Sequence, residues 1–237
     1  MIKRIVNLYW ELRYRWKKYW WDKTSKKSVI NGLALMYHHV TDDFIDINES
    51  CKCKVDEFRG GLNKIQNEGR RFVSVDEMLS ILDRKSSEPF AVVTFDDVPD
   101  NFFTNAYPIL RERSIPFILF LTTSFIGKQG YLSEKQIKEL DRDPLCTIGA
   151  HTLTHPMLRR VSNSKEELTK AKHILEERLG HSVDYMAYPY GRQSSVSRRI
   201  MREARDAGYL CAFGTIQSPI TDTSSNNFYY IPRIVNE

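Results

Sequence analysis

From about residue 33 onward, short runs of apolar residues alternate with longer stretches in which apolar residues recur at helical spacing. The short runs predict strands at 33–37, 72–73, 91–95, 116–121, 147–150, 183–188 and 209–213. The longer stretches predict helices at 55–67, 75–82, 105–113, 133–140, 164–179 and 196–207. This alternation predicts an α/β fold with a mostly parallel sheet, although periodicity alone does not choose between an open sheet and a closed barrel.

Individual residues mark some of the element ends. Ser164 followed by Glu167 predicts a capping box at the start of one helix, and Gly180 predicts its end. The Ser-, Thr- and Asn-rich stretch 217–227 predicts a loop. No repeat or low-complexity linker divides residues 29–237, so we expect them to form one domain.

The segment 1–28 has a pattern of its own. Its apolar and aromatic residues form one helical stripe, and all four tryptophans of the chain lie in it. Charged residues interrupt the stripe too often for a signal peptide or a membrane-spanning helix. Basic residues opposite aromatic ones favour an amphipathic helix lying on an anionic membrane surface, whereas packing on its own domain or on a partner subunit is the alternative.

The net charge of +5 is unevenly distributed. Residues 1–28 contain nine of the 35 Lys and Arg residues and two of the 30 acidic ones, so this segment carries +7 and the remainder −2. A basic arm on a mildly acidic body does not make a polyanion-binding surface, and nucleic acid is not an expected partner. Cys51 and Cys53 are too close in sequence for an ordinary disulfide, and no second CxxC-type pair accompanies them to make a zinc knuckle, which favours free thiols in a reducing compartment.

Polar residues that can carry chemistry follow three of the predicted strands. They lie at 96–97, 151–155 and 188–191, each at the carboxyl end of its strand. In parallel α/β folds the loops at that edge converge and build sites. Each patch alone is a weak signal, but the three together at strand ends favour a functional site over a structural explanation.

The residue types in these patches indicate a metal site. Asp96 and Asp97 are adjacent, so they cannot both face the same way and are expected to take different roles. His151 and His155 lie four residues apart and can close on one ion. Two histidines and a carboxylate form a ligand set that leaves positions open for water and substrate.

These motifs resemble those of the polysaccharide deacetylase superfamily, carbohydrate esterase family 4. The resemblance extends over about residues 33–235 and is carried by 93–97 (VTFDD), 149–155 (GAHTLTH) and 187–191 (AYPYG), with 35–40 and 231–234 similar to flanking signatures of one branch. It implies a distorted (β/α) barrel and hydrolysis of an acetamide on a sugar. It also implies a divalent metal, with zinc as the expected ion.

By position, the resemblance assigns a role to each of five residues. Asp96 matches the general base and Asp97 the carboxylate ligand of the metal. His151 and His155 match the two histidine ligands. Tyr190 matches the residue whose backbone N–H helps to hold the oxyanion.

The sequence also departs from the pattern of the family. Val98 replaces the glycine that usually follows the aspartate pair, and Ala187 replaces an arginine that orients the base in many relatives. We hypothesise that Arg233 supplies this cation, the alternative being a surface or packing arginine. The late histidine that acts as acid in many members has no counterpart, which leaves His38 and His39 as candidates for an acid or a structural role.

The leading hypothesis is an N-deacetylase acting on an N-acetylated sugar in a polysaccharide, a nucleotide-linked sugar or a lipid-linked glycan. One alternative is a catalytically inactive barrel that binds a glycan or a partner, and another is a deformylase acting on a lipid-linked sugar. The lack of a usual export signal and the basic aromatic arm lead us to expect a cytoplasmic location at the inner face of the membrane.

Overall fold

The computed structural model describes residues 28–44, 51–222 and 227–235 of the chain. The helix predicted for residues 1–28 falls outside this part, apart from its last residue, and stays a prediction. The strands are β1 (Gly32–Tyr37), β2 (His39–Val40), β3 (Lys52–Cys53), β4 (Arg71–Phe72), β5 (Phe90–Asp96), β6 (Phe117–Leu121), β7 (Cys146–Ala150), β8 (Tyr185–Ala187), β9 (Cys211–Phe213) and β10 (Ile234–Val235). The α-helices are α2 (Val55–Asn67), α3 (Val75–Arg84), α4 (Tyr107–Glu112), α5 (Glu134–Asp141), α6 (Ser164–Leu179) and α7 (Arg198–Asp206).

The main sheet is parallel throughout and closes on itself. Its order is β10-β1-β5-β6-β7-β8-β9, with β4 also paired to the start of β5. The segment 231–235 joins the two edges, because Ile231 bridges to Phe213 in β9 while β10 pairs with Leu35 and Met36 of β1. The pattern of the sequence left open sheet and barrel as alternatives, and the structure is the distorted (β/α) barrel that the resemblance implied.

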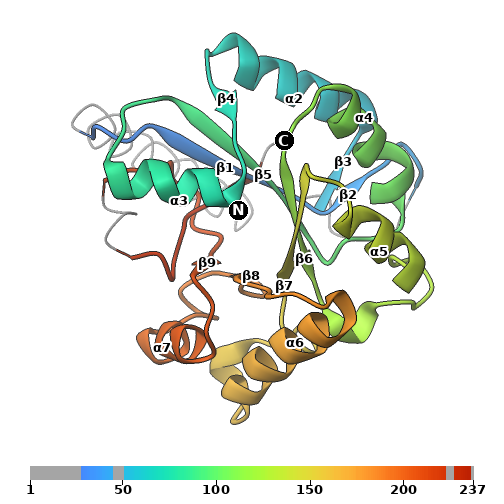
Figure 1. The fold of residues 1–237 in the computed structure, drawn as a ribbon, viewed down its shortest axis with the longest axis vertical. Coiled ribbons are helices and arrows are strands. Elements are labelled where there is room, and N and C mark those ends of the chain that lie inside the picture. The colour runs from blue at the N-terminus through green and yellow to red at the C-terminus, as the bar shows by residue number, and fades with distance from the viewer. Residues whose placement is uncertain (1–27, 45–50, 223–226, 236–237) are drawn as a thin grey trace, which may run out of the picture.

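Two apolar clusters fill the two sides of this sheet. The odd-numbered residues of β5 pack with apolar side chains of α2, α4, α5 and α6, whereas Phe90 and Val92 pack with those of α3. Figure 1 shows the first group of helices, with α7, arranged around the outside of the curved sheet, while α3 lies on its inner side. Because strand residues alternate in direction, Asp96 shares the inward direction of Phe90 and Val92.

Most predicted elements are present, some with different bounds. The helix expected at 55–67 is α2 with the same bounds, since its apolar residues Phe58, Leu62 and Ile65 form one buried face. The helix expected at 105–113 is preceded by a π-helical turn at Phe102–Ala106, which continues into α4. The short pairings of β2 with β3 and of β10 with β1 were not predicted.

The predicted capping box at the start of α6 is wrong. Asn163 precedes the helix without a side-chain cap, and the Ser164 hydroxyl instead donates to Glu203 on α7. The Glu167 carboxylate turns away from the helix end and accepts hydrogen bonds from Leu153 and Thr154. Because three donors of a neighbouring loop bind the Glu167 carboxylate, it does not reach back to cap the helix.

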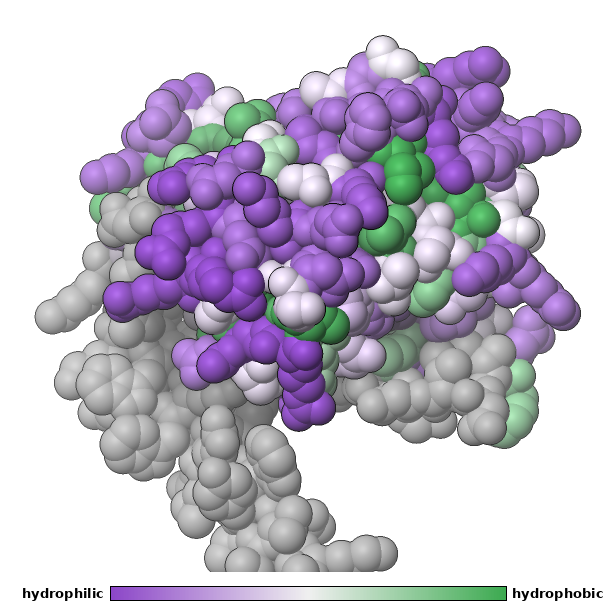
Figure 2. Space-filling view, turned by 90° about the horizontal axis from the view of Figure 1, so that it is seen from below, coloured by the Kyte–Doolittle hydropathy of each residue, from purple (hydrophilic) through white to green (hydrophobic). Residues whose placement is uncertain are grey.

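The outer surface is mostly polar over α6 and α7. Figure 2 looks at the molecule from the side on which these two helices lie in Figure 1, and hydrophilic residues dominate the part that is coloured. Among the helices that the structure describes, none has both the length and the apolar composition needed to cross a bilayer. The predicted free thiols are present at Cys53, Cys146 and Cys211.

Candidate active site

The carboxyl ends of five parallel strands meet at one rim of the barrel and carry the candidate residues. The strands are β1, β5, β6, β7 and β8, which are neighbours in the order of the sheet. At this rim, the candidate polar residues lie either at the last position of a strand or in the loop that follows it. These residues are His38, Asp96, Asp97, Thr122, His151, His155 and Tyr190.

Arg233 holds Asp96 from inside the barrel. Its Nη1 and Nη2 donate to the two carboxylate oxygens of Asp96, each at 2.6 Å, and the arginine is fully buried. Its Nε donates to the Gly214 carbonyl at 2.9 Å, and Nη1 also reaches the hydroxyl of Thr94 at 3.1 Å. The sequence left a surface or packing arginine as the alternative, and the structure places Arg233 in a bidentate ion pair with Asp96, above the ring of Phe120.

This pair determines the charge of Asp96. Burial by itself would raise the pKa of the carboxyl, and Asp96 is 2% exposed. The charge and the hydrogen bonds of Arg233 oppose burial, and the pKa of Asp96 lies well below its ordinary value. Asp96 is therefore ionised, with both oxygens oriented by the fork of the guanidinium group.

Asp97 faces a different direction from its neighbour because the chain bends at this point. Both Asp97 and Val98 have positive φ, 59° and 49°, and the Val98 amide donates back to the Asp96 carbonyl at 2.6 Å. A β-branched residue rarely takes this conformation, and at Val98 its side chain is buried in the core. The bend presents the Asp97 carboxylate to the rim, where Oδ1 accepts from the Thr122 hydroxyl at 3.0 Å.

His151 is fixed by hydrogen bonds on both its backbone and its ring. Its amide donates to the Leu121 carbonyl at 2.8 Å, and its Nδ1 lies 2.8 Å from the Ala187 carbonyl. A carbonyl can only accept, so Nδ1 carries the proton and Nε2 is left with a lone pair. Burial lowers the pKa of His151, more than the nearby Asp96 and Asp97 raise it, which keeps the ring in the neutral form that binds metals.

His155 lies at the end of the loop that His151 begins. This loop contains two residues with positive φ, Thr152 at 68° and His155 itself at 61°. The His155 amide donates to the Thr152 hydroxyl at 3.1 Å, which closes the loop on itself. As a result Nε2 of His155 lies 3.6 Å from Oδ1 of Asp97.

Asp97, His151 and His155 have the geometry and chemistry of a divalent-metal site. One ligand atom from each lies within 4.8 Å of the other two, and this is the metal-like cluster found among the described residues. Two neutral imidazole nitrogens with one carboxylate oxygen suit zinc and similar ions, and three ligands leave positions open. Asp96 also approaches His151, at 3.9 Å from Nε2, but its oxygens are already bound by Arg233.

Tyr190 brings a free backbone donor to the same rim. Its φ is 59°, and within the described residues its amide donates no hydrogen bond. Its ring lies 4.9 Å from that of His155, and the residue is 51% exposed. An exposed aromatic ring and an unpaired N–H therefore lie next to the candidate metal ligands.

The two histidines after β1 differ in the carboxylates that act on them: Asp96 and Asp97 for His38, and Asp97 and Asp100 for His39. Burial lowers the pKa of His38, and the charges of Asp96 and Asp97 partly offset this effect. His39 is engaged elsewhere, because its Nδ1 lies 2.9 Å from Nδ2 of Asn101. The structure thus separates two residues that the sequence could not tell apart.

Sequence reasoning missed Thr122 and misassigned Glu167. Thr122 follows a predicted strand directly, which was the only signal for it, whereas Glu167 matched a capping pattern.

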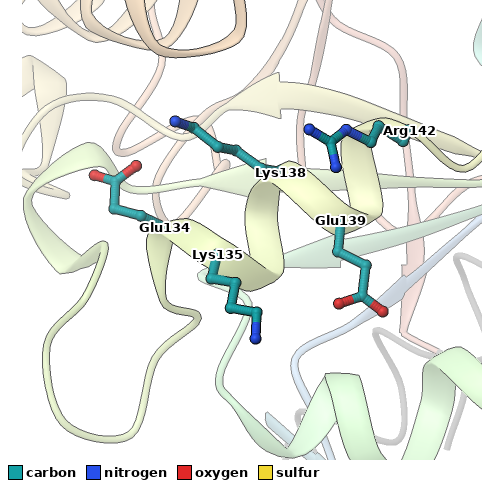
Figure 3. Close-up of a pocket in the computed structure, with 5 residues that line it drawn as sticks. All are labelled: Glu134, Lys135, Lys138, Glu139 and Arg142. Carbon is teal, nitrogen blue, oxygen red and sulfur yellow. The ribbon is translucent and has the colours of Figure 1, made fainter.

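The cavity beside Asp97 has a volume of about 10 Å³, room for about one water. A larger hollow, of about 460 Å³, is lined by Glu134, Lys135, Lys138, Glu139 and Arg142. Figure 3 shows these side chains on α5 and just after its end; all five are exposed, and none of them belongs to the candidate site.

Fold and side chains together define a (β/α)-barrel protein with a candidate divalent-metal site beside a buried, ionised acid. The chain belongs to the polysaccharide deacetylase family, because the model of that family matches residues 83–212, more than half of its length. The matched part includes the two aspartates, the two histidines and Tyr190, and it ends before Arg233. The family resemblance seen in the sequence is therefore confirmed.

Similar proteins agree with this membership. The chain is 26% identical over 242 residues to the poly-beta-1,6-N-acetyl-D-glucosamine N-deacetylase of Staphylococcus aureus, covering 90% of this chain and 81% of that protein. The polysaccharide deacetylase BC0361 of Bacillus cereus has the same fold, with a TM-score of 0.75 and 23% identity over 86% of this chain and 64% of that one. IcaB of Ammonifex degensii superposes with a TM-score of 0.73 and 24% identity, covering 87% and 91%. The relatives named as N-deacetylases are hydrolases of carbon–nitrogen bonds, the enzyme class that the sequence predicted.

Proposed function

We propose that this chain is a metal-dependent N-deacetylase that removes acetyl groups from N-acetylglucosamine residues of a polysaccharide. The substrate class comes from the name of the Staphylococcus aureus relative. The observation that carries the proposal is the arrangement at the rim: Asp97, His151 and His155 converge within 4.8 Å, and an ionised Asp96 lies directly beside them.

The proposed reaction is the addition of water to the acetamide carbon, followed by loss of acetate and the free amine. A divalent cation held by the three ligands, for which we favour zinc, would supply Lewis acidity toward the carbonyl group and the attacking water. Asp96 takes one proton from that water, and Arg233 keeps its carboxylate ionised and correctly oriented. The amide of Tyr190 donates to the oxygen that becomes negatively charged during the attack.

The departing amine needs a proton, and we assign this step to His38. The charges of both Asp96 and Asp97 act on the pKa of His38, whereas His39 is influenced by Asp97 and Asp100 and its ring is engaged with Asn101. His38 can relay to the nitrogen the proton that Asp96 has taken from the water, so that the carbon–nitrogen bond breaks and both side chains return to their starting forms. Comparison of His38→Ala with His39→Ala tests the assignment, because only the first should abolish most of the acetate release.

No described feature favours the two alternatives raised by the sequence. An inactive binding barrel would be expected to lose the base or the ligands first, and all four are present and mutually oriented. A deformylase would use the same groups on a smaller acyl chain, so the two activities differ only in the substrate that is turned over. We retain the membrane face as the proposed location, and it rests on residues 1–28 alone.

The decisive experiment measures bound metal and acetate release on the same preparation. Acetate release from β-1,6-linked N-acetylglucosamine oligomers should require zinc, stop with chelator, and be lost in Asp96→Asn. Asp206→Asn, at an exposed aspartate of α7, is the matched control and should behave as wild type. Bound zinc with formate release from N-formyl oligomers and no acetate release would establish the deformylase instead. A folded protein that binds no divalent metal at all would refute the metal-dependent hydrolase.

A further inference from the structure

Glu167 is a buried carboxylate outside the set of residues that the proposed reaction uses. It lies in the first turn of α6 and is 4% exposed. Its Oε2 accepts from the amides of Leu153 and Thr154 at 3.1 and 2.9 Å, and its Oε1 accepts from the Thr154 hydroxyl at 2.7 Å. All three donors belong to the loop between the two histidine ligands.

This carboxylate has no cationic partner within the described part of the chain. Its neighbour Glu166 is exposed and pairs with Lys170 one turn along the helix, whereas no lysine, arginine or histidine forms a salt bridge with Glu167. A buried carboxylate without a counter-ion is costly unless hydrogen bonds replace the lost water. The loop supplies those hydrogen bonds, so any movement of the loop away from α6 would strip Glu167 of its donors.

The loop itself would not keep its shape unaided. Thr152 and His155 both have positive φ, and a non-glycine residue in this region is strained unless its surroundings hold it there. On one side, the amides of Thr123 and Ser124 donate to the Thr152 and Leu153 carbonyls at 3.2 and 2.9 Å. On the other side, Glu167 binds the next donors of the same segment. The loop is thus fixed between the start of a short helix at 123–125 and α6.

The two histidines depend on this loop to different degrees. His151 has its own contacts, through its amide to Leu121 and its ring to Ala187, which α6 does not provide. His155 follows Thr154 directly, and its position is set by the loop backbone. Its Nε2 lies 3.6 Å from Asp97 only while that backbone keeps its positive φ angles.

We propose that Glu167 is a positioning residue that sets the place of His155 in the metal site by accepting the hydrogen bonds of the 152–154 segment. This inference rests on the proposed metal site. It assigns Glu167 no contact with substrate and no part in proton transfer. If Glu167 positions His155 in this way, helix α6, on the outside of the barrel, influences how tightly the site at the rim binds its metal ion.

The test compares zinc affinities, measured by competition with a chromophoric chelator, for Glu167→Ala and Glu167→Gln. Loss of a residue that orients a metal ligand typically weakens metal binding 10- to 100-fold, and we expect about this loss for the alanine variant. Glutamine should retain most of the affinity, because its oxygen can accept from both amides while its nitrogen donates to the Thr154 hydroxyl. With cobalt(II) as probe, the visible absorption of the alanine variant should change shape, as expected when one ligand is displaced.

Two controls separate positioning from general damage. Glu166→Ala removes the exposed acid next to Glu167 and should leave zinc affinity unchanged. Leu175→Ala removes a buried side chain from the core-facing side of α6 and should lower the unfolding midpoint without changing zinc affinity. A fall in affinity in Leu175→Ala equal to that in Glu167→Ala would show that lost helix stability is the cause and would overturn the proposal.

The remaining outcomes are equally distinct. Wild-type affinity in a folded Glu167→Ala protein would overturn the proposal while leaving the metal site in place. If the alanine variant does not fold, the glutamine variant decides. Glutamine keeps the shape and the hydrogen bonds of Glu167, so a loss of zinc affinity of 10-fold or more in Glu167→Gln would contradict the proposal that these hydrogen bonds position His155. If the wild-type chain binds neither zinc nor cobalt(II), the proposed function itself is refuted, and this result is distinct from a loss of affinity confined to the Glu167 variants.

Discussion

The end of β5 and the loop after β7 each depend on a buried carboxylate, and the two are held by opposite means. Asp96 is inside the barrel and is bound by a guanidinium group through two hydrogen bonds of 2.6 Å. Glu167 is outside the sheet and is bound by two amides and a hydroxyl, all uncharged. Both are less than 5% exposed, so the difference lies in the partners and not in the burial.

This difference matches what each carboxylate has to do. A base must be ionised and must point one way, and a buried cation secures both at once. A carboxylate that organises a loop must gather several backbone donors, which a cation would displace. Asp96, whose charge is used to accept a proton, is therefore paired with a cation, whereas Glu167, which maintains the conformation of a loop, is bound by neutral donors.

The largest expected effect comes from making the same chemical change at both carboxylates. Asp96→Asn should lower the rate of acetate release by about 10²–10⁴-fold, because it removes the proton acceptor. Glu167→Gln should keep most of the rate. Steady-state assays at saturating zinc measure both. Similar rates in the two variants would remove the functional distinction between the carboxylates.

Breaking the ion pair from the side of the arginine should have the next largest effect. Arg233→Ala leaves Asp96 buried without its partner and should destabilise the protein by about 3–5 kcal/mol in urea unfolding. The double variant Arg233→Met with Asp96→Asn has no charge left to bury and should recover much of that loss. Asp96-dependent activity at the wild-type level in Arg233→Ala would contradict the proposed role of the arginine.

A smaller effect is expected from removing one neutral donor from Glu167. Thr154→Val deletes the hydroxyl that bonds Oε1 and keeps the shape of the side chain, so it should cost about 1 kcal/mol of stability. Zinc affinity should fall only a few-fold, since both amides still bind Oε2. Thr169→Val, on the exposed side of α6, is the control and should leave zinc affinity at the wild-type value.

The smallest effect is expected at a charge pair on the surface. His181 bonds the Ser182 carbonyl and the Asp141 carboxylate, and these two contacts raise its pKa above the ordinary value. Protonated His181 therefore stabilises the folded state. This contribution to the free energy of unfolding is fully present below the pKa of histidine in the unfolded chain, about 6.5, and is lost as the pH rises through the higher pKa of the folded protein. His181→Gln should therefore cost well under about 1 kcal/mol near pH 5.5 and nothing at pH 9, as measured by unfolding at both pH values. A cost that grows with pH would reverse the assigned direction.

The fold was largely predictable because its elements are amphipathic. The helix α2 has its predicted bounds, and β5 and β6 differ by one or two residues, since their burial patterns are regular. The closure of the barrel was not predictable from periodicity, because β10 is two residues long and its pairing with β1 depends on register. The π-helical turn at Phe102–Ala106 has the same apolar content as an α-helix and gave no separate signal.

The site was predictable as a set of residue types at strand ends, but not as a set of contacts. The convergence of Asp97, His151 and His155 follows from parallel strands ending at one rim. The partner of Asp96 could only be guessed, because an arginine far away in sequence can reach it only if the barrel closes. Glu167 was misread because Ser-x-x-Glu describes a local pattern, and its true donors lie 13 and 14 residues upstream.

The closing segment also bears on the order in which the chain can fold. Asp96 precedes Arg233 by 137 residues, an interval that a ribosome translating at about 5–20 residues per second needs ~7–27 s to cover. Throughout that interval the carboxylate has no buried counter-charge, and sealing it inside the barrel would be unfavourable. We therefore expect the nascent protein to keep this end of the sheet open to water until the segment 231–235 emerges. The active site would then form in the same event that completes the barrel.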